Sequence, residues 1–170
     1  MNDTKTKPIP DVELQLARDG LQAPDEADIR DWTCRAARAA GGAGGMITIR
    51  VVDDSEMREL NRYWRGRDYS TNVLSFPFDM PEGLPAEAVE PIIGDIAICA
   101  PVVEREANEQ DKPVRAHWTH MVVHGVLHLL GHDHEQAGEA EIMEALEVSI
   151  LAELGHEDPY REPDTGVRGQ

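Results

Sequence analysis

The pattern of apolar and polar positions predicts four β-strands. Alternating polar and apolar residues, the period-two pattern of a strand with one buried face, occur twice early in the chain and again around Leu74 and Phe76. Pro77 favours an edge or end position for that third strand, because proline cannot donate to a neighbouring strand. The fourth segment is mostly apolar, which favours an interior strand, and Gly94 within it indicates a bulge or a close backbone approach. The predicted strands are residues 11–16, 47–51, 74–78 and 92–99.

The sequence predicts five helices, four from apolar positions three and four residues apart and one as a polar helix from about Pro101 to Gln110. Proline or acidic residues stand at most of their starts, where they suit the first helical turn. The second helix has two faces, because Met57, Leu60 and Trp64 form a stripe suited to packing while arginines form another. The fourth is apolar on nearly every side and therefore belongs inside the domain. The helices begin at Pro24, after Asp53, near Pro101, at Pro113 and after His134, and the last ends at Gly155.

A histidine motif lies at the end of the fourth predicted helix and in the turn after it. His124 and His128 are about 40° apart around the helix axis, so both imidazoles can reach one ion. Gly131 tolerates the left-handed conformation that ends helices, so the chain can turn back and present His134 to the same point. Three neutral imidazoles suit zinc and leave a fourth position for water. We therefore predict one Zn²⁺ per chain on these three histidines, with other divalent transition metals as alternatives.

Other residues near the motif have more than one interpretation. A structural zinc site would need a fourth protein ligand, and neither Cys34 nor Cys99 is near in sequence. His132 could be that ligand, but we favour a role for it at the rim of the site or in contact with substrate. Asp133 could orient a ligand histidine or contact a metal-bound water.

His117 and His120 share the metal-facing stripe of the same helix, one to two turns earlier. They could line the cleft, or they could act behind the ligands or in packing.

Gly125 excludes one familiar chemistry. The same histidine spacing occurs in metzincin peptidases, where a glutamate directly after the first histidine is the general base. Here glycine occupies that position and cannot accept a proton. The motif therefore predicts hydrolytic chemistry other than the standard peptidase mechanism.

The charge of the chain limits how it can bind anions. The formal net charge is −17, which argues against nucleic-acid binding through bulk charge. An anionic partner must therefore meet a local basic patch. Four arginines within ten residues of the second helix and the turn after it form such a concentration, although arginine stripes are also common on solvated helix faces. The candidates for anion or RNA contact are Arg58, Arg62, Arg65 and Arg67.

The length of 170 residues suits one domain, which we assign to residues 1–155, with 156–170 as a mobile polar tail. No run approaches the roughly 18 apolar residues of a membrane span, and the first residues lead into no apolar signal core. Two cysteines do not make a disulfide framework, which agrees with a reducing compartment. We expect a cytoplasmic protein with no membrane partner.

With these residues in view, the sequence resembles the YbeY family of bacterial endoribonucleases. Three blocks carry the resemblance in the family's order and cover about residues 46 to 155. The glycine after the first motif histidine belongs to the family pattern as well. The blocks are residues 61–68 with 71–78, residues 94–99, and the histidine motif with its approach from Trp118.

The resemblance implies an α/β (α+β) domain with a small mixed four-stranded sheet backed by helices, the histidine motif lying on a buried helix and the turn after it. It also implies zinc on His124, His128 and His134, and a cleft that contains Arg65. The implied activity is single-strand-specific cleavage of RNA in maturation of the 16S rRNA 3′ end and in ribosome quality control. Implied partners are the ribosome, a small-subunit ribosomal protein and a ribosome-assembly GTPase. The loop at 79–91 and the C-terminal tail fall outside the shared blocks.

These observations combine into one mechanistic hypothesis. The metal polarises a phosphoryl oxygen or lowers the pKa of a bound water, and Arg65 neutralises charge that builds up at phosphorus. The general base and the nucleophile stay unassigned. Two other functions fit the motif: a metal-dependent hydrolase of peptides or small esters, and a ribosome-assembly binding protein whose zinc is structural.

Overall fold

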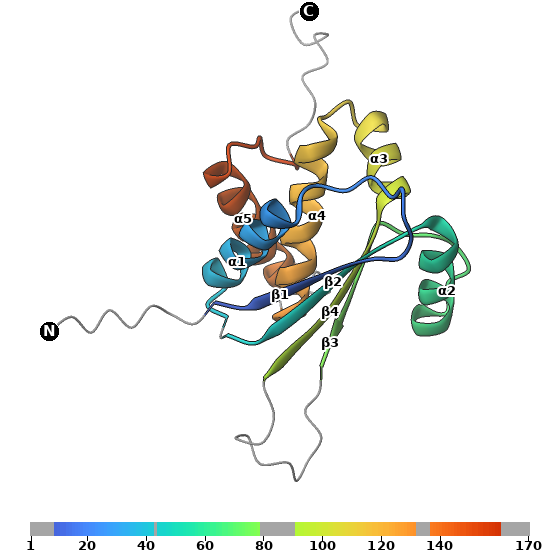
Figure 1. Ribbon diagram of the computed structural model, residues 1–170. Coiled ribbons are helices and arrows are strands. Elements are labelled where there is room, and N and C mark those ends of the chain that lie inside the picture. The colour runs from blue at the N-terminus through green and yellow to red at the C-terminus, as the bar shows by residue number, and fades with distance from the viewer. Residues whose placement is uncertain (1–8, 43, 79–90, 132–136, 161–170) are drawn as a thin grey trace, which may run out of the picture.

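The computed structural model describes residues 9–42, 44–78, 91–131 and 137–160. Its centre is a four-stranded sheet of order β1-β2-β4-β3 (Figure 1). The first three of these strands are parallel and β3 is antiparallel to β4. The predicted mixed sheet, with the third strand at an edge and the fourth inside, is therefore confirmed. The strands are β1 (Asp11–Leu16), β2 (Met46–Val52), β3 (Val73–Pro77) and β4 (Ile92–Cys99).

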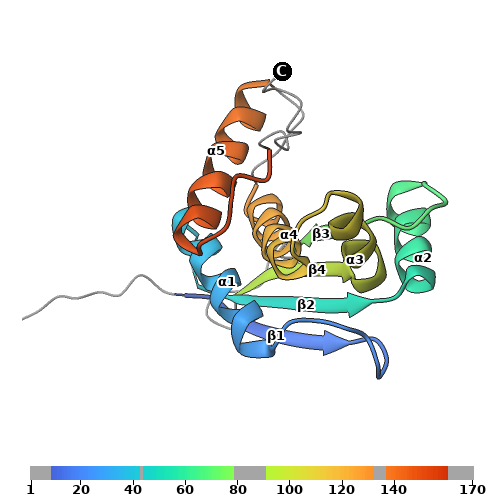
Figure 2. The same cartoon turned by 90° about the horizontal axis from the view of Figure 1, so that it is seen from above.

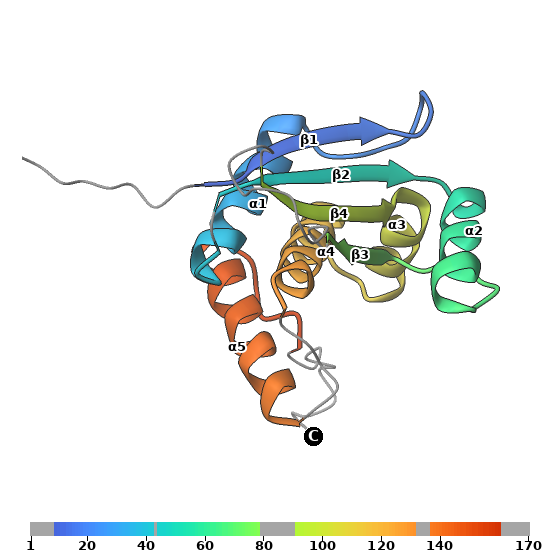
Figure 3. The same ribbon diagram turned by 90° about the horizontal axis from the view of Figure 1, so that it is seen from below.

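Five helices surround the sheet. Helices α1 and α4 cover one face, and α5 lies outside them, as the views from above and below agree (Figures 2 and 3). Helix α2 lies at the other end of the molecule from α5. The five predicted helices are found within a few residues of their expected bounds. They are α1 (Glu26–Ala39), α2 (Asp54–Arg65), α3 (Ala100–Glu109), α4 (Val114–Leu129) and α5 (Ala137–Glu153).

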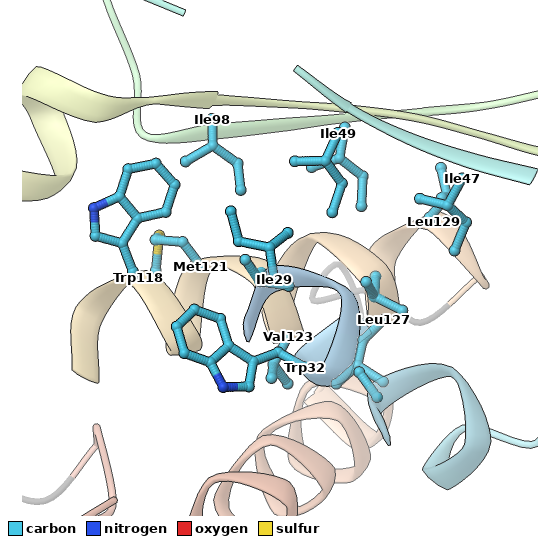
Figure 4. Close-up of a cluster of buried hydrophobic side chains, with 14 of the residues drawn as sticks. Ile29, Trp32, Ile47, Ile49, Ile98, Trp118, Met121, Val123, Leu127 and Leu129 are labelled. Atoms are coloured by element: carbon cyan, nitrogen blue, oxygen red, sulfur yellow. The ribbon is translucent and has the colours of Figure 1, made fainter. Parts of the chain in front are cut away.

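The main hydrophobic core lies between the sheet and helices α1 and α4. Ile47, Ile49 and Ile98 project from the sheet toward Trp118 and Leu129 of α4, and Ile29 and Trp32 of α1 close the cluster (Figure 4). The fourth helix is buried along most of its length, as its mostly apolar sequence predicts. This burial makes α4 a rigid support for any side chain that it carries.

Two glycines allow backbone elements to approach closely. Gly94 has a φ of 153°, and a Cβ there would overlap the Phe76 carbonyl oxygen and Leu129. The β2–β4 register also shifts opposite this residue, so both the predicted bulge and the predicted close approach are confirmed. Gly125 brings α4 against the sheet, because a Cβ there would lie 2.9 Å from Ile96 Cγ2 and 3.1 Å from Val73 Cγ2.

The prediction that Trp64 belongs to the packing stripe of α2 is wrong. Met57 is fully buried, but the inward position one turn later is taken by Asn61, whose side-chain amide donates to the Tyr69 carbonyl at 2.8 Å. Trp64 is 61% exposed because this last turn of the helix has little beneath it except Phe76. The helix itself begins as predicted, with the Asp53 carboxylate accepting from the Glu56 N–H at 2.9 Å.

None of the helices in the described part of the chain combines the length and the apolar run that a bilayer crossing requires. Both cysteines are free thiols, Cys99 buried and Cys34 partly so. Residues 154–160 follow α5, and Tyr160 contacts Glu147 on that helix. The first part of the segment that we assigned to a tail therefore packs on the domain, and residues 161–170 lie outside the described residues.

Candidate active site

A cleft of about 370 Å³ lies between α2, β3 and α4. Residues from two distant parts of the sequence meet there: the segment from the end of α2 through β3, and the histidine-bearing side of α4. The cleft thus brings the predicted arginine and two of the predicted ligands to one place. Its walls include Asn61, Arg65, Arg67, Tyr69, His124 and His128.

Local backbone geometry places Arg65 and Arg67 in this cleft. Helix α2 ends at Arg65 because Gly66 adopts a left-handed conformation with a φ of 69°, and its N–H caps the Arg62 carbonyl. The chain then turns toward β3, and the Arg67 guanidinium donates to the Tyr69 hydroxyl at 2.9 Å. Arg58 lies farther back and is paired with Asp68 at 2.8 Å. No acid forms an ion pair with Arg62 or Arg65 in the part of the chain that the structure describes.

His124 and His128 lie side by side on α4. Their ring centroids are 4.6 Å apart, as the four-residue spacing predicts. Gly131 has a φ of 99°, so the left-handed residue expected after the helix is present. His132, Asp133 and His134 lie outside the described residues, so the third ligand stays a prediction.

Behind the cleft, a buried carboxylate contacts two histidines of α4. Glu147 of α5 is fully buried, and its two oxygens lie 2.6 Å from His124 Nδ1 and 2.9 Å from His120 Nε2. The Tyr160 hydroxyl donates to the same carboxylate. Burial by itself would raise the pKa of Glu147, but these hydrogen bonds outweigh it and lower the pKa to about 2. Glu147 is therefore ionised at neutral pH.

An ionised Glu147 fixes the proton on His124. A carboxylate without a proton only accepts hydrogen bonds, so Nδ1 of His124 must be the donor, which in the neutral imidazole leaves the lone pair on Nε2. This is the arrangement in which a carboxylate behind a metal-bound histidine sets its tautomer and ring orientation. The residues present therefore fit a metal ion bound through Nε2 of His124 on the side of His128.

The same group offers a second way to hold a metal. The ligand atoms of His120, His124 and Glu147 all lie within 4.8 Å of one another, so this buried group could itself bind an ion. It differs from the predicted set by using Nδ1 rather than Nε2 of His124.

Neither His117 nor His120 lines the cleft with the other candidates. His117 Nε2 lies 2.9 Å from Glu106, whose carboxylate also accepts from the Asn72 side chain. His120 joins Glu147 as described. Both are buried, so the packing and supporting roles left open by the sequence match their positions better than direct contact with a ligand in the cleft.

Sequence reasoning missed Glu147 and Tyr160. A signal for Glu147 was present, because it lies four residues after Met143 and three before Ile150 on the buried side of α5. An acid at such a position is almost never fully buried unless it is paired. Tyr160 gave no such signal, since its contact depends on how residues 154–160 pack after the helix ends.

The model of the family described as "Endoribonuclease YbeY" matches residues 22–155, which include α2, the cleft and Glu147. This chain belongs to the endoribonuclease YbeY family. The endoribonuclease YbeY of Alcanivorax borkumensis is 59% identical over 153 residues, covering 90% of this chain and 87% of the relative. That of Stutzerimonas stutzeri is 54% identical over 160 residues, covering 92% and 96%. The resemblance noted from the motifs is thus confirmed. It begins earlier in the chain than residue 46, at residue 22, and so includes α1.

A solved structure shares the fold. The solution structure of TM1509 from Thermotoga maritima aligns with a TM-score of 0.53 and 22% identity, covering 89% of this chain and 99% of that one. At this identity the likeness concerns the fold alone, and it agrees with a single α/β domain.

Proposed function

We propose that this protein is a zinc-dependent endoribonuclease that cleaves single-stranded RNA in the cytoplasm. In this proposal it acts in maturation of the 16S rRNA 3′ end and in ribosome quality control. The observation that carries the proposal is the cleft in which Arg65 and the His124–His128 pair share the walls, in a chain of the YbeY family.

The proposed metal ligands are His124, His128 and His134. Two observations support this set: the close approach of the first two rings, and Glu147 as a partner for Nδ1 of His124. Zinc in this position would supply a Lewis acid toward a phosphoryl oxygen of the substrate.

The protein's own side chains bind and orient the RNA. The planar guanidinium of Arg65 suits two parallel hydrogen bonds to a phosphate, and it opposes the negative charge that grows on the phosphoryl oxygens during cleavage. Arg67 adds positive charge at the same wall, and its hydrogen bond to Tyr69 limits its motion. Glu147 keeps His124 in one tautomer and one orientation.

The charge of the whole chain favours selective docking. With a formal charge of −17, the chain as a whole repels RNA, so binding depends on a local concentration of arginines such as the one at the cleft. The remaining acidic surface suits basic ribosomal proteins, which supports a small-subunit ribosomal protein as a partner, with a ribosome-assembly GTPase as a second partner from the family resemblance.

The direct test is cleavage of a 5′-labelled single-stranded RNA by the zinc-loaded protein, with a duplex of the same sequence and a casein peptide offered in parallel. We expect cleavage of the single strand only, and loss of that cleavage in H128A. H156A is the matched control, because His156 lines a different cavity from the one that contains Arg65 and His128. Cleavage of the peptide, or undiminished RNA cleavage by a folded H128A protein, would reject the proposal.

A cellular test separates the enzyme from a binding protein with a structural zinc. Cells whose only copy is H128A should accumulate 16S rRNA with unprocessed 3′ ends. Normal 3′ ends in these cells, with the variant present at wild-type level, would favour the binding role.

A further inference from the structure

An unusual set of aromatic side chains is exposed beside the cleft. Tyr63 is 79% exposed and Trp64 is 61% exposed, although both are large side chains whose burial would stabilise the fold. The chain has only eight aromatic residues, and five of them lie between positions 63 and 78. Among the described residues, the most exposed aromatic side chains therefore belong to this segment.

These rings are held in position. The Tyr63 and Trp64 centroids are 4.9 Å apart, and Trp64 lies 5.9 Å from Phe76 on β3. Both contacts are edge-to-face, so the three rings do not stack face to face on one another. We call Tyr63, Trp64 and Phe76 the aromatic surface.

The aromatic surface adjoins the cleft at Arg65 without lining it. Trp64 directly precedes Arg65, which lines the cleft, and Trp64 contacts Phe76 on the face of β3 opposite to the one that Ser75 presents to α4. A polymer whose phosphate lies at Arg65 therefore has its next unit within reach of the exposed Trp64 ring. Tyr69, which is 51% exposed, adds a further ring within the cleft itself.

The charges around the aromatic surface select the kind of partner. Arg62 and Arg65 flank Trp64 in a chain that is otherwise strongly acidic, so a basic peptide would be repelled here. Cationic side chains that follow a backbone, next to rings that stack on bases, are the usual combination for single-stranded nucleic acid.

We propose that the aromatic surface is a stacking site for an unpaired nucleobase adjacent to the phosphate held at Arg65. This inference rests on the proposed function, since it needs RNA in the cleft. It gives a physical reason for single-strand preference, because a base within a duplex is already stacked and cannot reach the rings.

The test measures binding of a 2′-O-methyl single-stranded oligonucleotide to the zinc-loaded protein. W64A should weaken binding between about 5-fold and 150-fold, the range for losing one base-stacking contact. W64F should retain most of the affinity because it keeps a ring. L16A is the matched control, since Leu16 is 51% exposed on β1 at the opposite edge of the sheet.

An abasic oligonucleotide of equal length and charge isolates the stacking. If Trp64 contacts a base, W64A should weaken binding of the normal oligonucleotide but not of the abasic one. A signal within the protein tests the same contact, because Trp32 and Trp118 are buried and Trp64 is the exposed tryptophan. The normal oligonucleotide should therefore quench the emission of the wild type and leave that of W64F unquenched.

The outcomes separate this inference from the proposed function. If the wild type cleaves single-stranded RNA while W64A binds both oligonucleotides as tightly as the wild type, the stacking site is wrong and the nuclease stands. Equal weakening for normal and abasic oligonucleotides would also reject stacking. If the wild type neither binds nor cleaves RNA, the proposed function itself fails.

Discussion

Arg65 is the residue on which substrate chemistry depends most directly in this account. It lines the cleft from the end of α2 and makes no ion pair among the described residues, so its charge is available to a phosphate. We predict that R65A lowers the rate of RNA cleavage about 10²- to 10³-fold, the cost of removing one donor that stabilises transition-state charge. R65K should recover only part of the rate, since lysine lacks the planar pair of donors. Zinc content, measured by elemental analysis, should not change in either variant, and normal cleavage by R65A would remove Arg65 from the mechanism.

Glu147 does not line the cleft and acts on it through its contact with His124. E147Q keeps the shape of the side chain but cannot accept from both His124 and His120 as a carboxylate does. We predict that it weakens zinc binding about 10- to 100-fold, as measured by competition with a chelating dye. E141Q, on an exposed position of the same helix, should bind zinc like the wild type. Unchanged zinc affinity in E147Q would show that Glu147 does not orient His124. Complete loss of zinc binding would indicate that Glu147 is itself a metal ligand.

At the scale of elements, the approach of α4 to the sheet depends on Gly125. The position that carries the catalytic glutamate in metzincin peptidases here points at Ile96 and Val73, so the sheet fills the space that such a side chain would need. The absence of that base, which the sequence already indicated, thus has a packing reason as well.

A methyl group tests this packing. G125A should lower the free energy of unfolding by about 1 kcal/mol, because overpacking costs more than the gain in helix propensity. Urea denaturation measures the change. G138A is the control, because a Cβ there meets nothing within 4 Å, and its stability should stay equal or rise slightly. An equally stable G125A protein would mean that the helix and sheet can separate without cost.

A second link between elements is sensitive to pH. Glu106 of α3 contacts His117 of α4 and Asn72 at the entry to β3. Burial would raise the pKa of Glu106, but these hydrogen bonds hold it below its ordinary value of 4.5. A lowered pKa in the folded state means that the ionised form adds stability above about pH 4.5, and that this contribution disappears as pH falls further.

We therefore predict that E106Q loses about 1–2 kcal/mol of stability at pH 7, the range for a hydrogen bond to a charged group reduced for partial exposure. The difference from the wild type should shrink as pH falls below 4.5. Thermal denaturation across pH 3–7 measures it, with E109Q at an exposed position of the same helix as the control. A difference that stays constant with pH would contradict the assigned role of the charge.

Elements with strong patterns were predictable. The apolar run at 92–99 coincides with β4, and the two-histidine face of α4 follows from helical spacing alone. The predictions failed where tertiary contacts decide the outcome. Trp64 has the right spacing to be buried, but the end of α2 extends past the packing surface, and Glu147 interrupts an apolar stripe only because α4 offers it two histidines.

The whole molecule combines an acidic surface with a basic cleft that contains two neighbouring histidines. Lys and Arg number 16 against 33 acids, so long-range electrostatics oppose RNA except where the arginines gather on α2 and the turn after it. The histidine pair and these arginines come from opposite sides of that cleft. Everything proposed about catalysis requires a metal ion on the cleft side of His124.

A zinc-edge anomalous difference map from a crystal of the zinc-loaded protein tests that claim most directly. The account predicts one strong peak about 2.0–2.1 Å from a nitrogen of each of His124, His128 and His134. It also predicts that Nδ1 of His124 stays bonded to Glu147. A peak among His120, Nδ1 of His124 and Glu147, with none between His124 and His128, would contradict it.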